Sequence, residues 1–217
     1  MGSGKTNLVS AVIDASLDDR KQGISAAPIL YYYCGDQEGS SGRCDPRDVM
    51  RSLLRQLSVA DDGTCTIAEQ VHLEFKRRQA EAKVYLGTMG KLEPHECTRW
   101  ITELLRNDQA LIIIDAIDEV ETSDRHLLLR ELVALRDDPT CTVKLFLSSR
   151  DDTNISHWLE GTPEVCLQTR LTRDDMRLFV HRCVSLAITN RCLLNGKVDN
   201  YLQLELEKSL LDGADGM

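Results

Sequence analysis

Apolar residues follow two different patterns along this chain, continuous runs and stripes at every third or fourth position. The continuous runs are PILYYYC at 28–34, ALIIID at 110–115 and TVKLFLSS at 142–149, and each has the length of a strand. A strand without a polar face is buried on both faces, as in a parallel sheet covered by helices. A weaker strand is expected at 164–169.

Amphipathic stripes between these runs predict helices. The predicted helices are 7–17, one opened by Asp45-Pro46, 67–86, one opened by Pro94, one capped by Asp124, one opened by the Thr172–Asp175 capping box, and 198–211. In the helix after Thr172, the stripe predicts a buried face made of Met176, Phe179, Val180, Cys183, Val184 and Ala187. Strands that alternate with helices form βαβ units, so the predicted fold class is α/β, a three-layer α/β/α sandwich with a mostly parallel sheet.

Composition narrows the classes of partner. The 217 residues carry a net charge of -9, which on average repels a phosphate backbone and makes nucleic acid a poor partner. No apolar run approaches membrane-spanning length, and no secretory leader opens the chain. The 8 cysteines are scattered without a C-x-x-C pair and are predicted to be reduced thiols. We therefore expect a cytoplasmic protein that binds neither nucleic acid nor membrane.

The first candidate site is a phosphate-binding loop at the start of the chain. Its residues are Gly2, Ser3, Gly4, Lys5, Thr6 and Asn7. Glycines let backbone N–H groups point at phosphate oxygens, the following helix adds its positive dipole, and a lysine reaches the terminal phosphates. Only the last six of the eight positions in G-x-x-x-x-G-K-[ST] are present. The alternative is a glycine-rich turn or a leader unrelated to phosphate binding.

The second candidate site follows the apolar strand 110–115. Asp115 ends that strand, and Asp118 and Glu119 lie in the turn beyond it. A carboxylate at the carboxyl end of a parallel strand lies where such sheets bind ligands, so Asp115 could hold Mg²⁺. A second carboxylate a few residues on could orient an attacking water. The alternative is a solvated acidic loop.

The third candidate site follows the strand 142–149, which ends in Ser148, Ser149 and Arg150. A guanidinium at this edge could contact a γ-phosphate and report its presence. The alternative is a surface arginine paired with Asp151 or Asp152.

Together these motifs resemble the NACHT branch of the STAND P-loop NTPases, and within it fungal NACHT proteins with a nephrocystin-type NTPase domain. The second motif of that family reads hhhhD-[small]-hDE, which residues 111–119 match in spacing and type. The next strand of the family ends in S-R, as at Ser149-Arg150, and the run YYYC followed by RDVMRSLLRQL is also similar. The resemblance covers roughly residues 1–185.

The resemblance implies binding of ATP or GTP with Mg²⁺, slow hydrolysis, and a signalling switch used in fungal self/non-self recognition and related innate immunity. By the same resemblance Lys5 contacts the β- and γ-phosphates, and Thr6 and Asp115 hold Mg²⁺. Asp118 and Glu119 are candidates to position water, and Arg150 senses the γ-phosphate. The expected domains are an NTPase core at 1–170 and the beginning of a helical subdomain at 171–217. Protein partners or self-assembly would act through flanking domains.

One part of the family fold has no counterpart in the sequence. The family has a first strand before the phosphate loop, which we expect between the strands that carry the second and third motifs. Either another segment fills that position, or the sequence is the downstream part of a longer product, which is the interpretation we favour. We therefore expect this chain by itself to bind nucleotide poorly and to hydrolyse it slowly or not at all.

Two other classes of function stay open. The chain could be an inactive interaction module that no longer binds nucleotide. It could also be a small metabolic P-loop kinase, although such enzymes need an arginine-rich lid and Arg150 is the main basic candidate here.

Overall fold

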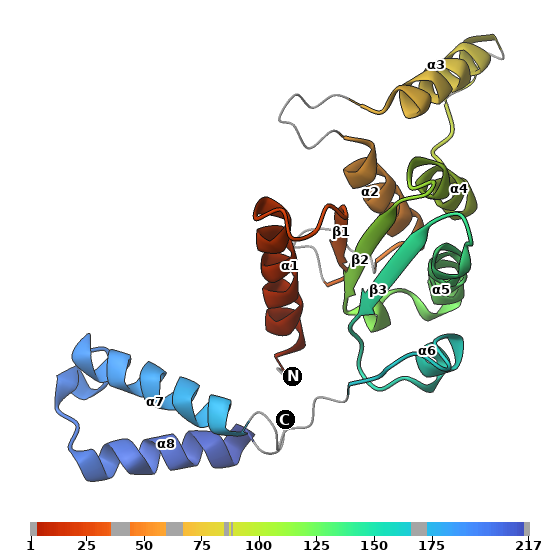
Figure 1. Cartoon of the computed structure of the whole chain (residues 1–217). Coiled ribbons are helices and arrows are strands. Elements are labelled where there is room, and N and C mark those ends of the chain that lie inside the picture. Colours follow the sequence, from red (N-terminus) through yellow and green to blue (C-terminus); the bar gives the residue numbers. More distant parts are fainter. Residues whose placement is uncertain are drawn as a thin grey trace. The chain divides into compact units, whose positions relative to one another are not determined.

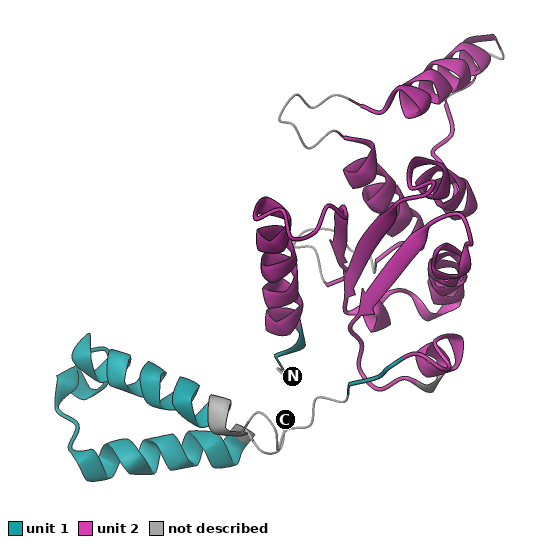
Figure 2. Ribbon diagram, in the orientation of Figure 1, with its two compact units in different colours: residues 1–5, 163–217 teal, residues 6–162 magenta. Residues whose placement is uncertain are grey.

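The computed structural model describes residues 4–35, 44–59, 67–84, 87, 89–165 and 173–214. They divide into two compact units (Figure 2). One unit is Thr6–Thr162, and the other combines the residues up to Lys5 with those from Pro163 onward. None of the helices in the described ranges is long and apolar enough to cross a membrane.

The unit Thr6–Thr162 is built on a sheet of three parallel strands. They are β1 (Ile29–Tyr33), β2 (Gln109–Asp115) and β3 (Thr142–Leu147), in the order β1-β2-β3 (Figure 1). All three coincide with the continuous apolar runs, which confirms the predicted strands and the parallel sheet.

Helices cover both faces of this sheet. Because successive side chains of a strand point to opposite faces, Ile113 packs against Val9 and Ile13 of α1 (Lys5–Lys21), while Ile112 and Ile114 face the larger core. That core lies under α2 (Pro46–Ser58), α4 (Pro94–Leu104) and α5 (Thr122–Asp137). The unit is therefore a three-layer α/β/α fold, as predicted.

Two of the predicted helix starts are confirmed and one is wrong. The Asp45 carboxylate accepts a hydrogen bond from the Arg47 amide at 2.8 Å, just before Pro46 opens α2. Pro94 opens α4 as predicted. The predicted cap of α5 is wrong: the helix begins at Thr122, so Asp124 lies inside its first turn and adds negative charge where the helix dipole favours it.

Two further helices complete this unit. α3 (Glu69–Val84) confirms the helix predicted at 67–86 and buries none of its residues. An ion pair between Arg78 of α3 and Glu96 of α4 links the two helices. The short helix α6 (Thr153–Trp158), which sequence patterns did not predict, is capped by Asp152.

The structure corrects the expected position of the family's first strand. β2 and β3 are hydrogen-bonded neighbours in a parallel ladder that runs from Gln109 opposite Thr142 to Ile114 opposite Leu147. No strand fits between them, so the expectation of a gap between the second and third motifs is wrong. Within the described ranges, the two sheet edges without a strand partner are the outer edges of β1 and β3.

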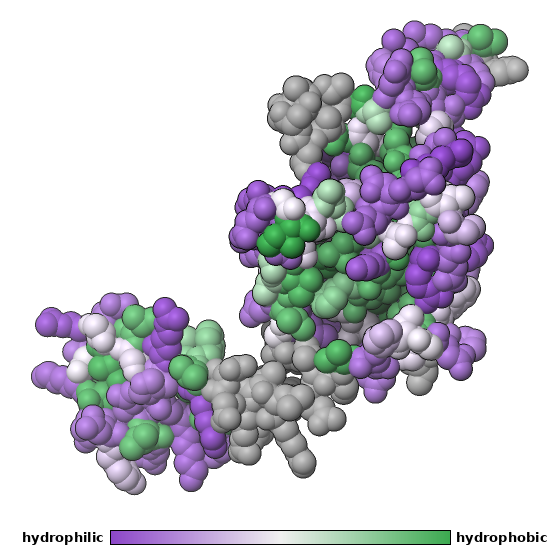
Figure 3. Space-filling view, in the orientation of Figure 1, coloured by the Kyte–Doolittle hydropathy of each residue, from purple (hydrophilic) through white to green (hydrophobic). Residues whose placement is uncertain are grey.

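The second unit contains a pair of helices, α7 (Arg173–Thr189) and α8 (Asn200–Ala214), joined through the short helix η2 (Leu194–Gly196). α8 confirms the helix predicted at 198–211. The predicted buried face of α7 is confirmed in part: Val184 is buried and Met176, Val180 and Ala187 are half-buried. It is wrong at Phe179, which is 67% exposed, and at Cys183, which is also exposed. A helix that packs on a single partner helix covers a narrow stripe, and Figure 3 shows hydrophobic side chains on the surface of this unit.

Two predictions made for this region lie outside what the structure describes. The weak strand at 164–169 falls mostly on residues that are not described, and Thr172, the first residue of the predicted capping box, lies outside them too.

Candidate functional site

The second and third motifs meet at the carboxyl edge of the sheet. β2 and β3 are parallel neighbours, so the residues that follow them, 116–121 and 148–152, leave the sheet side by side. Figure 1 shows the amino end of α1 at this same edge, because α1 runs antiparallel to the strands. The edge therefore combines strand ends and a helix amino terminus.

Asp115, the last residue of β2, is a buried carboxylate held by its neighbours. It is 3% exposed, and the Ser148 hydroxyl donates a hydrogen bond to its Oδ1. The same Ser148 oxygen accepts from the Ala116 amide at 2.9 Å. On the other side, the Cys34 amide donates to the Asp115 carbonyl at 3.0 Å. Ser148 thus fixes the carboxylate and Cys34 fixes the backbone of Asp115. Ser148 is a site residue whose role the sequence did not reveal.

The turn after Asp115 has an unusual backbone conformation. Ala116 adopts the left-handed region, with φ 55° and ψ 49°, and leads into the short helix η1 (Ile117–Glu119). The Ile117 amide donates to the Ser148 carbonyl at 3.0 Å, and the Ile117 side chain is fully buried. This turn directs Asp118 and Glu119 towards the segment that follows β3.

Arg150 meets both of these carboxylates. Its amide donates to Asp118 Oδ1 at 3.0 Å, and its guanidinium lies 3.4 Å from Asp118 Oδ2 and 2.9 Å from Glu119 Oε1. The Arg150 side chain is 75% exposed, whereas that of Asp118 is 12% exposed. The alternative pairing of Arg150 with Asp152 does not occur, since Asp152 binds Arg125 instead.

A pair of thiols lies next to this acidic cluster. Cys34 follows β1, and the backbone of Cys44 forms an isolated parallel β-bridge with that of Val120. The hydrogen bond between the two thiols, together with burial, raises the pKa of Cys34, and the same hydrogen bond lowers the pKa of Cys44. Burial raises the pKa of the neighbouring Tyr32 to about 12. The six cysteines of the described ranges are free thiols, as predicted.

The phosphate-loop residues are described only in part. Gly2 and Ser3 lie outside the described residues, and Gly4 has a φ of 73°, a conformation that glycine adopts readily. Lys5 is the first residue of α1, and Thr6 and Asn7 are exposed in its first turn. In the described part of the chain, no hydrogen bond or ion pair joins Thr6 or Asn7 to the cluster of Asp115, Asp118, Glu119 and Arg150.

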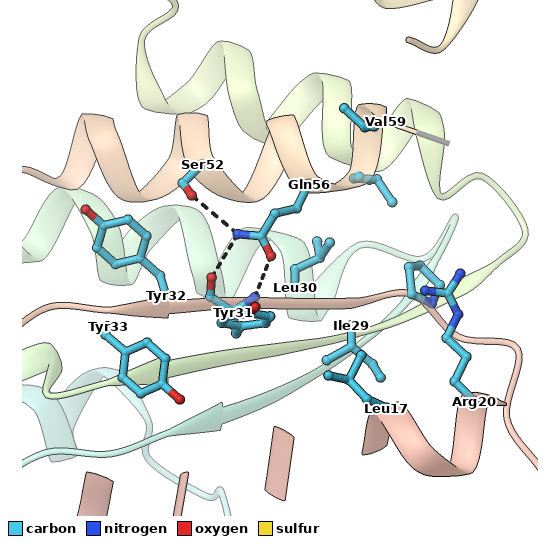
Figure 4. A pocket seen from close by; sticks show the side chains of 12 residues that line it. Leu17, Arg20, Ile29, Leu30, Tyr31, Tyr32, Tyr33, Ser52, Gln56 and Val59 are labelled. Atoms are coloured by element: carbon cyan, nitrogen blue, oxygen red, sulfur yellow. Dashed lines mark hydrogen bonds between the residues drawn. The ribbon is translucent and has the colours of Figure 1, made fainter. Parts of the chain in front are cut away.

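A surface pocket of about 840 Å³ lies apart from this cluster, beside β1, and no predicted site residue lines it (Figure 4). There the Gln56 side chain accepts from the Tyr31 amide at 3.0 Å and donates to the Tyr31 carbonyl at 2.8 Å (Figure 4). Across the described ranges, no three His, Cys, Asp or Glu side chains converge as a ready-made metal site.

The comparison with known proteins gives a family. Residues 1–150 match the family described as Nephrocystin 3, N-terminal, and this match covers more than half of the 217 residues. The chain therefore belongs to the nephrocystin 3 N-terminal family. No curated protein and no solved structure matches the chain.

Proposed function

We propose that this member of the nephrocystin 3 N-terminal family is a nucleotide-binding module of the NACHT type, a P-loop NTPase that takes ATP or GTP with Mg²⁺ and serves as a signalling switch in a larger protein. The observation that supports this most is the meeting of Asp115, Asp118, Glu119 and Arg150 at one sheet edge. A buried carboxylate, two further carboxylates and an arginine supply part of what phosphoryl transfer to water uses: a metal ligand, residues that position water, and a cation for the phosphate.

Arg150 suits the role of a γ-phosphate sensor because its present partners are exchangeable. The Arg150 side chain is exposed in both of its ion pairs, and pairs that solvent reaches contribute little to stability. A guanidinium forms charge-assisted, bidentate bonds to phosphate oxygens as well as to carboxylates. In this proposal, the Arg150 guanidinium leaves Asp118 and Glu119 and binds the γ-phosphate. The two carboxylates are then free to accept hydrogen bonds from the attacking water.

The oxygen atoms at this edge are of the type that Mg²⁺ prefers as ligands. Mg²⁺ prefers oxygen ligands and is bound by one or two carboxylates together with substrate phosphates, so the absence of a three-residue cluster from the described ranges does not argue against it. Asp115 and Thr6 would hold the ion, which supplies positive charge to the phosphates when bound. Lys5 and the amides of Gly2, Ser3, Gly4 and Asn7 would hold the phosphates.

Thermal unfolding tests the proposal. With Mg²⁺-ATP or Mg²⁺-GTP at about 100 times its dissociation constant, the folded state should gain ~2.7 kcal/mol, a shift of a few degrees. Lys5→Ala and Asp115→Asn should abolish the shift. Lys21→Ala is the matched control, because Lys21 lies at the opposite end of the same helix and pairs with the exposed Asp18.

Comparing the affinities for triphosphate and diphosphate nucleotides distinguishes a switch from simple nucleotide binding. If Arg150 senses the γ-phosphate, the chain should prefer ATP or GTP over the corresponding diphosphate, and Arg150→Ala should remove that preference while diphosphate affinity stays unchanged. Failure of every nucleotide to shift the unfolding temperature, up to millimolar concentrations, would refute the proposal and favour an interaction module.

A further inference from the structure

Arg125 is a buried arginine on the apolar face of α5. It lies in the first turn of the helix and is 7% exposed. It precedes Leu128, Leu129 and Leu132 by three, four and seven residues, which is the spacing of one helix face, and all three leucines are buried. A buried charge requires hydrogen-bond acceptors close by.

The guanidinium finds its acceptors in two separate segments. Its Nη1 donates to Asp152 Oδ2 at 2.5 Å, and its Nη2 donates to the carbonyls of Asp118 at 2.7 Å and Val120 at 3.1 Å. The Nε atom is buried and has no acceptor in the described part of the chain. Arg125 therefore connects the turn after β2 with the segment after β3, and it does so with one donor unsatisfied.

These two segments carry the candidate site. The turn contains Asp118 and Glu119, and Asp152 lies two residues beyond Arg150. Arg150 joins the segments at the surface, where its side chain is 75% exposed. Arg125 joins them in the interior, where its own side chain is 8% exposed and that of Asp152 is 25% exposed. The buried connection is the one that solvent and salt screen least.

Asp152 is a firm anchor for this connection. Its carboxylate caps α6 by accepting from the Asn154 amide at 2.9 Å. That backbone bond, followed by the bond and the charge of Arg125, lowers the pKa of Asp152, so the carboxylate is ionised at neutral pH. Arg125 and α6 thus hold the same side chain from two directions.

We propose that Arg125 is a positioning residue, which holds the turn 116–121 against the segment 149–152 so that Asp118 and Glu119 meet Arg150. A methionine would fill similar space, but it would leave the Asp152 carboxylate and the carbonyls of Asp118 and Val120 without the donors of Arg125. The acceptors that lose their partner lie in the two segments that Arg125 connects, so the effect of its loss should be largest there. The consequence for hydrolysis rests on the proposed function, whereas the positioning itself does not.

Hydrogen exchange on the intact chain tests the positioning. Arg125→Met should speed amide exchange roughly tenfold or more in peptides covering 116–121 and 149–152, while exchange in 111–114 of β2 stays unchanged. Arg125→Lys keeps the charge but not the fork of donors, so it should restore protection in at most one of the two segments. The control is Arg136→Met on the same helix, where Arg136 pairs with its neighbour Asp137.

Two results would overturn the proposal: unchanged exchange in both segments, or faster exchange spread evenly over the sheet. Steady-state release of inorganic phosphate from Mg²⁺-ATP gives the second readout. Where the wild-type chain hydrolyses ATP, Arg125→Met should lower kcat between roughly ten- and a hundredfold with little change in KM, and an unchanged kcat would contradict the proposal. A wild-type chain that neither binds nor hydrolyses nucleotide would refute the proposed function, and hydrogen exchange would still decide the role of Arg125.

Discussion

Replacement of Ser148 by alanine is the perturbation whose effect the structure defines best. The Ser148 hydroxyl makes two hydrogen bonds, a buried one to the Asp115 carboxylate and a partly buried one from the Ala116 amide at 2.9 Å. Ser148→Ala removes both and leaves a carboxylate oxygen and an amide without these partners at a site where Asp115 is 3% exposed. A buried group left unpaired costs about 1–3 kcal/mol, and the bond of the Ala116 amide is only partly buried and contributes less, so we expect a loss of about 2–4 kcal/mol in the free energy of unfolding.

The neighbouring serine provides the control. Ser149 is also a serine after β3, but its hydroxyl donates to the Arg150 carbonyl at 2.7 Å, an exposed bond one residue away. Ser149→Ala should therefore change stability by less than about 0.5 kcal/mol. The two variants remove the same atom from adjacent positions, so their difference isolates the burial and the partners of Ser148.

Urea unfolding followed by tryptophan fluorescence is a suitable assay. The only tryptophans of the chain, Trp100 and Trp158, lie in the unit Thr6–Thr162, so the signal reports the unit that contains the site. With a urea m-value of about 2 kcal/mol/M, a loss of 2 kcal/mol lowers the midpoint by about 1 M. A Ser148→Ala midpoint within about 0.2 M of that of Ser149→Ala would refute the reasoning, because the two hydrogen bonds would then contribute nothing measurable.

Three further variants or reactions test separate parts of the same unit. Ala116→Val should destabilise it by at least about 1 kcal/mol in the urea assay, because a β-branched residue resists the left-handed conformation, whereas Ala116→Gly should stay within about 1 kcal/mol of wild type. Gln56→Ala exposes the Tyr31 backbone at the sheet edge and should cause concentration-dependent self-association in sedimentation velocity, and a variant as monomeric as wild type would contradict this. Because its pKa is lowered, Cys44 should react with iodoacetamide at pH 7 before Cys34, whose pKa is raised; peptide mapping that finds equal labelling would contradict the assignment.

The three strands could be predicted because their signal is local. A run such as ALIIID has no polar face, so it can only be buried on both sides, and β2 is covered by α1 on one face and by the larger core on the other. The order of the strands is a different kind of information. Nothing in the runs themselves shows which strand pairs with which. The expected gap between the second and third motifs came from the family resemblance, and the ladder between β2 and β3 shows that it is wrong.

Side-chain partners were harder to predict than elements. Arg150 was weighed against pairing with its sequence neighbours, yet its carboxylate partners lie 31 and 32 residues away. Arg125 did leave a signal, since an arginine at the spacing of three buried leucines marks a charge directed into the core. The buried face of α7 was confirmed only in part, because an apolar stripe shows what a helix could bury and not how much of it a partner covers.

The ladder between β2 and β3 explains why two motifs so far apart in sequence act as one cluster. With Ile114 opposite Leu147, Asp115 and Ser148 are the next residues in register, and they bind each other. Two and three residues further on, Arg150 and Asp118 meet across the same gap. A slip of one residue would turn the Ser148 side chain to the other face and break both contacts. The register thus builds the acidic cluster without any help from the phosphate loop, and stability assays on Ser148 and nucleotide assays on Lys5 therefore measure independent halves of the proposed site.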